Sequence, residues 1–166
     1  MNHPSPRVFV VDPARSALRY HLAHRLHRVE GVSSRIQGKA VVQPDGKVLG
    51  VVVVPIASFR SGDEDRDSRT FELLGAAASF KGESRLELPA GPASIQLAMG
   101  GELTLHEVRR PLEVPLVLDV AADGTARVRG SFDVSLDSHA VQRPAFLFVK
   151  VEDTCRIELD LTFRQA

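Results

Sequence analysis

Three histidines that recur at every third residue, His21, His24 and His27, are the first side chains whose spacing suggests chemistry. Imidazole nitrogens bind zinc, and this spacing on a helix would gather them into one site. The flanking residues alternate as in a strand, however, where His21 and His24 point to opposite faces. Because no cysteine or acidic cluster completes a site, we expect no metal and no cofactor. We interpret the three as histidines of a strand end and a loop.

Two other reactive side chains lack partners in the sequence. His106 follows an alternating segment, and neither a nucleophile nor a carboxylate pair accompanies it, as general acid–base catalysis would require. Cys155 is the only cysteine, so no internal disulfide forms, and it falls on the apolar side of the final alternating segment. We therefore expect Cys155 to be a buried, unreactive thiol.

The composition is that of an ordinary globular protein, with 43% hydrophobic and 25% charged residues among 166. Lys plus Arg and Asp plus Glu both number 21, which argues against a nucleic-acid binder. We expect residues 1–6 to be a disordered lead-in and residues 7–166 to form a single domain. The N-terminus shows no apolar leader, and no apolar run spans a bilayer. These features predict a cytoplasmic protein as the chain is written, and a periplasmic one if a leader has been removed.

Most of the chain alternates apolar and polar residues with a period of two, which predicts strands with one dry and one wet face. Turn signals such as Pro44-Asp45-Gly46 separate these segments, and His24–Glu30 is expected to be a charged connection. The expected strands are Arg7–Val11, Ser16–His24, Ser34–Val42, Lys47–Ile56, Phe80–Leu88, Ala93–Leu105, Arg110–Val120, Thr125–Asp137 and Phe146–Phe163. Hairpin-linked strands in this number predict an all-β fold, either an antiparallel barrel or a sandwich.

One stretch breaks the alternation. Residues 61–75 are predicted to form a short helix, with Ser61 and Glu64 as a capping box and Gly75 as its C-terminal stop. Lys47–Ile56 is apolar on both faces, so we expect this helix to cover its outer face.

A sheet with this pattern can close on itself, and its function then depends on what fills the interior. Several inward positions are small, namely Gly38, Ala40, Gly50, Ala78, Gly82, Gly101, Ala126 and Gly130. Small residues favour a cavity for a long apolar molecule, although glycines are also expected where a sheet bends or bulges. The residues expected to line the cavity, or to form the core if it is filled, are Leu18, Tyr20, Leu22, Ile95, Leu97, Met99, Leu103, Leu112, Val114, Leu116, Val128, Phe132, Val134, Ile157 and Leu159.

Three polar side chains are candidates for contact with the headgroup of such a ligand. His24 lies on the dry face, Arg66 falls in the predicted helix, and Arg143 lies in an irregular loop. A surface ion pair with a nearby carboxylate explains Arg66 equally well. If His24 instead acts with Tyr20, the barrel is an isomerase or cyclase of an apolar substrate.

Five motifs, in order along the chain, resemble those of the bacterial YceI-like family. They are Val11-Asp12-Pro13-Ala14-Arg15-Ser16 with Tyr20 and His24; Gly31 and Gly38; Arg66-Asp67; the run from Gly101 to Leu112, similar to Gly-x-Leu-Thr-x-His-Gly-Val-x-x-Pro; and Val151-Glu152-Asp153 with the final strand. The resemblance implies a lipocalin-like antiparallel barrel that binds polyisoprenoids, isoprenoid quinones or fatty-acyl derivatives. It also implies that His106 shapes a hairpin turn.

The sequence departs from the family pattern in places that bear on the ligand. Ser33 and Ile36 stand where aromatics are expected, Ala78-Ser79 replaces Tyr-Pro, and Glu107 replaces a glycine. Losing inward aromatics changes the shape of the cavity, so the ligand need not be the family's best-known one.

Together these features predict an all-β, lipocalin-like antiparallel β-barrel of about eight strands with one short helix. We expect it to bind, and to be suited to carry, a long apolar molecule without catalysing a reaction. The alternatives are the pocket enzyme and a structural or interaction module with a filled core. The expected partner is a lipid-like small molecule, with no nucleic acid and no transmembrane segment, and an edge near the irregular loop suits a homodimer.

Overall fold

The computed structural model describes residues 4–26, 28–146 and 149–166. Residues 1–3, which belong to the predicted lead-in, and His27 lie outside the described residues. The helix is α1 (Glu64–Leu74). The strands are β1 (Arg7–Val11), β2 (Ala17–Ala23), β3 (Arg28–Ser33), β4 (Gln37–Val42), β5 (Lys47–Pro55), β6 (Ala77–Arg85), β7 (Ala93–Leu105), β8 (Val108–Val120), β9 (Ala126–Ser135), β10 (Ala145–Phe146), β11 (Val149–Lys150) and β12 (Thr154–Gln165).

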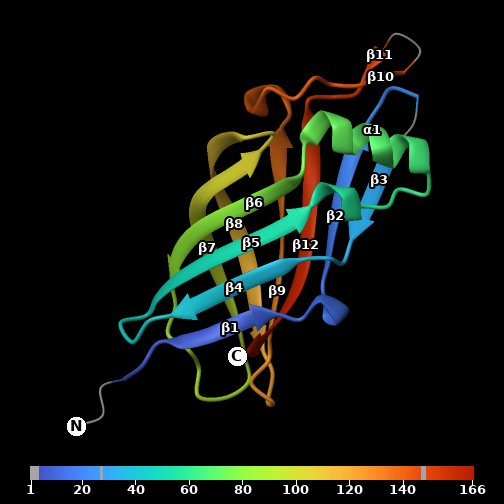
Figure 1. The fold of residues 1–166 in the computed structure, drawn as a ribbon. Coiled ribbons are helices and arrows are strands. Elements are labelled where there is room, and N and C mark those ends of the chain that lie inside the picture. Colours follow the sequence, from blue (N-terminus) through green and yellow to red (C-terminus); the bar gives the residue numbers. More distant parts are fainter. Residues whose placement is uncertain (1–3, 27, 147–148) are drawn as a thin grey trace.

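Eight strands close into an antiparallel barrel (Figure 1). The order β1-β4-β5-β6-β7-β8-β9-β12 returns to its start because β12 also pairs with β1, where Val11 lies opposite Phe163. The first half of β12 pairs instead with β2, which pairs in turn with β3. The predicted all-β barrel with one helix is confirmed. Strand β12 pairs with β1, β2 and β9 and is the seam at which the barrel closes.

The alternation in the sequence becomes the inside and the outside of this barrel. Along β7, half-buried and exposed residues alternate at every step from Ala93 to Leu103. At the end of the barrel near α1, Ile36 is only 2% exposed, and Ile56 and Phe59 are buried close to the helix. A period of two therefore sets which side chains reach the interior.

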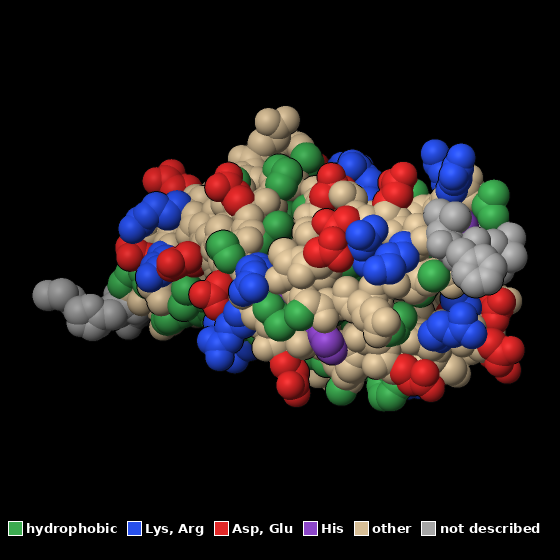
Figure 2. Space-filling model, turned by 90° about the horizontal axis from the view of Figure 1, so that it is seen from above, with side chains coloured by type: hydrophobic (Ala, Val, Ile, Leu, Met, Phe, Trp, Pro, Cys, Tyr) green, Lys and Arg blue, Asp and Glu red, His purple; other side chains and the backbone are tan. Residues whose placement is uncertain are grey.

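Ion pairs join neighbouring strands on the outer surface, and cations and anions lie intermixed on the face that Figure 2 shows. Arg127 on β9 holds Asp160 on β12 at 2.6 Å, and Arg129 holds Asp119 on β8 at 2.8 Å. The hydrogen bond from Arg127 keeps the pKa of Asp160 below its usual range. Because these pairs are solvent-exposed, each adds at most about 1 kcal/mol to stability.

Helix α1 is shorter than predicted and begins at a different residue. Asp63, not Ser61, is the N-cap, since its carboxylate accepts a hydrogen bond from the Arg66 N–H at 3.0 Å. The Ser61 hydroxyl instead donates to Asp67 at 2.6 Å. Gly75 ends the helix as predicted, in the left-handed region with φ of 87°. Several acidic residues near the start of the helix could serve as the N-cap, so the sequence alone did not predict which of them caps it.

The expectation that α1 covers the outer face of β5 is wrong. The helix lies across the end of the barrel, beside β2 and β3 (Figure 1). Leu49 and Val51 on the outside of β5 consequently remain 39% and 38% exposed. Single exposed aliphatic side chains are common on protein surfaces, so an apolar outer face does not require a cover.

Several predicted strand ends are shifted by a few residues, as in β4 and β6, and two segments differ more strongly from the prediction. Residues 24–30 were expected to be a charged connection, but β3 begins at Arg28, because its charges lie on the wet face while Val29 is buried. The final predicted strand, Phe146–Phe163, includes Leu147 and Phe148, which lie outside the described residues, and the rest of it belongs to the paired short strands β10 and β11 and to the long strand β12. Short strands with few alternating positions give too weak a period to recognise.

The hairpin that joins β7 to β8 contains His106, as the family resemblance implied. His106 and Glu107 form its tip with positive φ angles of 53° and 61°. Two-residue hairpins of this type favour glycine at the second position, because a side chain there is strained.

We expect Glu107→Gly to raise the free energy of unfolding by about 1 kcal/mol, since it removes this strain. Urea denaturation measures the change. Glu113→Gly, at an exposed position inside β8, is the matched control and should lower stability because glycine weakens a strand. An unchanged or lowered stability for Glu107→Gly would contradict the strain argument.

Candidate ligand-binding cavity

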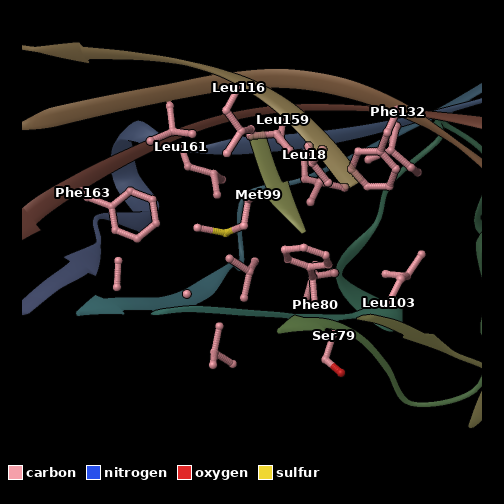
Figure 3. A pocket seen from close by; sticks show the side chains of 18 of the residues that line it. Leu18, Ser79, Phe80, Met99, Leu103, Leu116, Phe132, Leu159, Leu161 and Phe163 are labelled. Carbon is pink, nitrogen blue, oxygen red and sulfur yellow. The ribbon is translucent and has the colours of Figure 1, made fainter. Parts of the chain in front are cut away.

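The barrel encloses an apolar cavity of about 500 Å³ (Figure 3). All eight barrel strands and β2 contribute side chains to its wall, together with connections at both ends. At the α1 end, Thr70, Leu73 and Leu74 of the helix complete the wall. The volume lies within the range of small-molecule sites, about 300–1,000 Å³. The interior is therefore hollow, which the sequence left open.

Thirteen of the fifteen predicted interior residues line this cavity. They are Leu18, Tyr20, Leu22, Leu97, Met99, Leu103, Val114, Leu116, Val128, Phe132, Val134, Ile157 and Leu159. Ile95 and Leu112 have the same parity but do not border the cavity as described. Alternation assigns a side chain to a face, but it does not give the level along the barrel at which the interior is open. Contact of these residues with a ligand stays a prediction.

Sequence reasoning gave only the small inward residues of β4, β5 and β6, such as Ala40 and Gly50, and missed the large side chains of the wall formed by β1, β4, β5 and β6. The large side chains are those of Phe9 on β1, Val48 and Val52 on β5, and Phe80 on β6. In β5 both faces are apolar, so the alternation did not show which valines point inward. The signal was present in β1, where Phe9 and Val11 share one parity and are both buried.

A row of small residues crosses the inner wall. Ala40, Gly50, Gly82 and Gly101 lie side by side on β4, β5, β6 and β7. A Cβ atom on Gly50 would lie 3.3 Å from the Met99 sulfur, and one on Gly82 would lie 2.7 Å from the Phe80 ring. The Met99 and Phe80 side chains therefore lie against this row. This arrangement leaves the centre of the barrel open.

Gly101 has a different role from its neighbours in the row. A Cβ atom there would overlap the Lys81 carbonyl oxygen and would lie 2.5 Å from the Gly82 Cα atom. Here glycine allows two backbones to approach closely where the sheet curves. The glycines thus serve both functions that the sequence suggested: some make room for side chains, while Gly101 and Gly130 make room for backbone, since a Cβ atom on Gly130 would lie 2.6 Å from the Pro115 carbonyl oxygen.

Tyr20 closes the cavity beneath α1. Its ring lies over Gly31 on β3, where a Cβ atom would overlap it, and meets the Phe59 ring edge-on at 5.3 Å. No residue in the described ranges makes a well-aligned hydrogen bond to its buried hydroxyl. Burial raises the pKa of Tyr20, and the nearby Thr70 hydroxyl offsets part of the rise. Tyr20 therefore remains a neutral phenol at physiological pH.

A second, more polar cleft of about 450 Å³ lies beside α1 and shares part of the cavity wall, formed by Leu22, Thr70, Leu73 and Pro144. Two predicted headgroup residues, His24 and Arg66, line this cleft rather than the cavity. His24 is buried, and its Nδ1 accepts a hydrogen bond from the Leu26 N–H at 3.1 Å. Arg66 lies 3.9 Å from Asp63, a weak ion pair within the helix.

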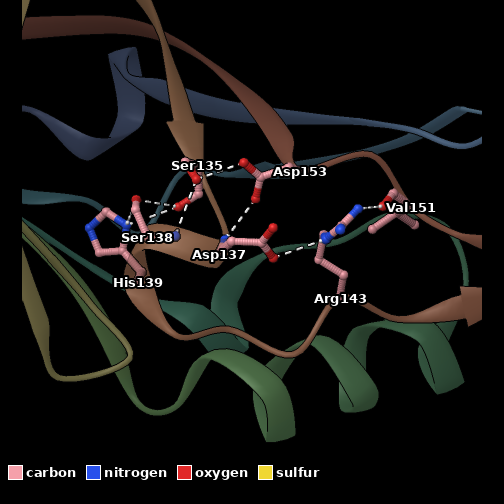
Figure 4. A network of polar contacts seen from close by, with 7 residues as sticks. All are labelled: Ser135, Asp137, Ser138, His139, Arg143, Val151 and Asp153. Atoms are coloured by element: carbon pink, nitrogen blue, oxygen red, sulfur yellow. Dashed lines mark hydrogen bonds and ion pairs between the residues drawn. The ribbon is translucent and has the colours of Figure 1, made fainter.

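Arg143, the third predicted headgroup residue, belongs to a polar network in the loops beyond β9 (Figure 4). Its Nε donates to Asp137 at 3.0 Å and its Nη1 donates to the Val151 carbonyl at 2.9 Å. Asp153 accepts hydrogen bonds from the Ser135 hydroxyl and the Asp137 N–H, and these hold its pKa below the usual range. Arg143 therefore ties two loops together and does not reach the cavity wall.

The remaining reactive side chains occupy separate places. His21 lies 3.6 Å from Glu30 and 3.4 Å from Glu158 on the outer face, and His27 is outside the described residues. In the parts of the chain that the structure describes, no three His, Cys, Asp or Glu side chains are placed to hold a metal ion. Cys155 is buried, as expected, and burial raises its pKa to about 12, so its thiol is not ionised at neutral pH.

A comparison with models of known protein families shows which family this barrel belongs to. Residues 9–163 match the model of the YceI-like domain. The chain belongs to the YceI-like family. The resemblance seen in the sequence motifs is thereby confirmed. Among the described residues of this YceI-like chain, no helix is both long and apolar enough to cross a membrane.

Solved structures share this YceI-like fold at low sequence identity. A polyisoprenoid binding domain from Saccharophagus degradans, implicated in plant cell wall breakdown, has a TM-score of 0.76 at 12% identity, over 95% of this chain and 98% of that one. BcnA of Burkholderia cenocepacia has a TM-score of 0.73 at 18% identity, over 92% and 98%. A Campylobacter jejuni YceI protein has a TM-score of 0.63 at 12% identity, over 87% and 88%. No curated protein sequence matches the chain.

Proposed function

We propose that this YceI-like protein binds a long apolar molecule inside its barrel and carries it chemically unchanged. The ligand classes that fit are polyisoprenoids, isoprenoid quinones and fatty-acyl derivatives. The observation that supports this proposal most directly is the apolar cavity, which is lined by aliphatic and aromatic side chains along the barrel. The fold shared with a domain named for polyisoprenoid binding supports the same class of ligand.

The driving force is the removal of the ligand's chain from water. Each buried methylene contributes about 0.8 kcal/mol, so a chain of a dozen carbons has a gross gain of about 10 kcal/mol. Association and ordering costs reduce this figure, which leaves micromolar or tighter binding. Affinity is therefore expected to increase about fourfold with each added methylene until the cavity is full.

This chain-length dependence is the test of the proposal. Straight alcohols from octanol to octadecanol compete with the neutral fluorescent probe N-phenyl-1-naphthylamine for the protein. We expect affinity to climb with length and then level off at a length set by the cavity. Native mass spectrometry of protein from its own host, followed by solvent extraction, should detect a bound lipid. A flat response across the series, with no lipid recovered, would exclude the carrier.

The pocket-enzyme alternative receives no comparable support. His24, which it requires as the base, lines the cleft beside α1 and is not part of the cavity wall. Turnover of an apolar substrate that disappears in His24→Ala, while alcohol binding persists, would favour the enzyme over the carrier.

A further inference from the structure

The wall of the cavity carries charge of one sign only. Among its described residues, the ionic side chains belong to Arg7 and Lys39, and none is acidic. Arg7 has the parity of Phe9 and Val11 on β1, which are both buried in the barrel. Lys39 has the opposite parity to Ala40, which lines the cavity, and is exposed on the outer face. Arg7 is therefore the cation on the inner face.

Arg7 stands where the cavity opens. It is the exposed first residue of β1, which lies at the end of the barrel away from α1 (Figure 1), and it lines the cavity together with residues of the connections β6–β7 and β8–β9. Cavity residues of these connections, including Gly91, Ala121 and Gly124, are exposed. At the α1 end, by contrast, the wall is formed by buried and half-buried residues, such as Phe59 and Leu74, and none of them is charged. The cavity thus has an exposed end with an arginine and a more enclosed end without a charge.

The guanidinium of Arg7 is held in place but not neutralised. Its carbon lies 5.6 Å from the centre of the Phe9 ring, and its Nη2 donates to the Gln165 side-chain oxygen at 3.0 Å. Within the described ranges, no carboxylate forms an ion pair with it, whereas Arg127 and Arg129 on the outer face are both paired. Most of its five N–H donors are therefore available to an oxyanion.

We infer that Arg7 binds the anionic headgroup, a carboxylate or a phosphate, of an amphiphile whose tail fills the cavity. This inference rests on the proposed function and gives the ligand a charge and an orientation. A guanidinium holds either oxyanion through two parallel hydrogen bonds. Because the mouth is open to water, the head keeps part of its hydration while the tail is buried towards α1.

The cleft beside α1 does not offer the same selectivity. Its ionic side chains are Asp63, Asp65, Arg66 and Arg69, two acids and two bases. With no net charge from these four, the cleft has no electrostatic preference for an anion. The headgroup is therefore placed at the end of the barrel opposite to the predicted His24 and Arg66.

The test compares three ligands with identical tails: hexadecanoate, hexadecyl phosphate and hexadecanol. We expect Arg7→Gln to weaken binding of the two anions about tenfold and to leave hexadecanol within about twofold. The matched control is Arg164→Gln, which removes an exposed cation opposite Val10 on the outer face of the same end. It should alter none of the three affinities. Isothermal titration at low salt, where screening is weakest, measures them.

Each outcome separates the inference from the proposed function. A loss confined to the carboxylate or to the phosphate supports the inference and identifies the headgroup. An equal loss for hexadecanol, or no change for either anion, overturns the role of Arg7 while the carrier stands. If the wild-type protein binds none of the three ligands, both the carrier and the inference are overturned.

Discussion

Gly101→Ala should unfold the barrel under conditions in which Gly100→Ala leaves it intact. We expect the first substitution to lower the free energy of unfolding by about 3 kcal/mol, since the new Cβ atom would meet the Lys81 carbonyl oxygen and the Gly82 Cα atom. Backbone atoms cannot move aside as a flexible side chain can. The strands β6 and β7 would have to separate, and this would break the curved wall beside the cavity.

Gly100 is the matched control because it precedes Gly101 in the same strand and faces outward. A Cβ atom on Gly100 meets nothing within 4 Å, so Gly100→Ala should change stability by less than about 0.5 kcal/mol. Chemical denaturation of both variants, followed by far-UV circular dichroism, gives the comparison. Equal stabilities would show that β6 and β7 do not need their close approach.

Ala40→Phe should weaken ligand binding about thirtyfold without unfolding the protein. Ala40 faces the cavity between Phe9 and Gly50, so a phenyl ring there occupies space that the ligand's chain would fill. Displacing two or three methylenes at about 0.8 kcal/mol each corresponds to a loss of affinity of about thirtyfold. Filling a cavity tends to stabilise a protein, so the melting temperature should hold or rise.

The control for this variant places the same ring on the outside. Ala98 lies on the exposed face of β7, so Ala98→Phe should leave affinity for hexadecanol unchanged. Competition with N-phenyl-1-naphthylamine measures both variants. If Ala40→Phe binds as tightly as the wild type, the ligand does not occupy the cavity and the proposed function is wrong.

The fold was predictable from the sequence where strands are long and have one apolar face. Ala93–Leu105 has thirteen positions, and its alternation gave both the strand and its inward residues. β3 has only six residues, with charges at Arg28 and Glu30, and it was mistaken for a connection. The alternation also does not predict how far along the barrel a side chain lies. Leu112 has inward parity yet does not border the cavity.

The candidate site was less accessible to sequence reasoning than the fold. Single polar residues were chosen by their surroundings in the sequence, and Arg143 proved to serve a loop network. Arg7 gave no signal, since one cation at the start of a short strand resembles any solvated residue. Its meaning depends on the pairing of β1 with β4 and β12, which brings it to the rim of an apolar space.

The seam formed by β12 also affects how the protein is made. Phe163, Arg164 and Gln165 at the end of β12 pair with β1, so residues near the two ends of the sequence, such as Phe9 and Gln165, lie opposite each other. On the ribosome, β12 emerges after every other strand of the barrel, and until then β1 and β9 each present an unpaired edge. Such edges are prone to pair with other chains, and contacts of this sequence separation form slowly. The nascent protein is thus expected to depend on chaperones until its last strand is released.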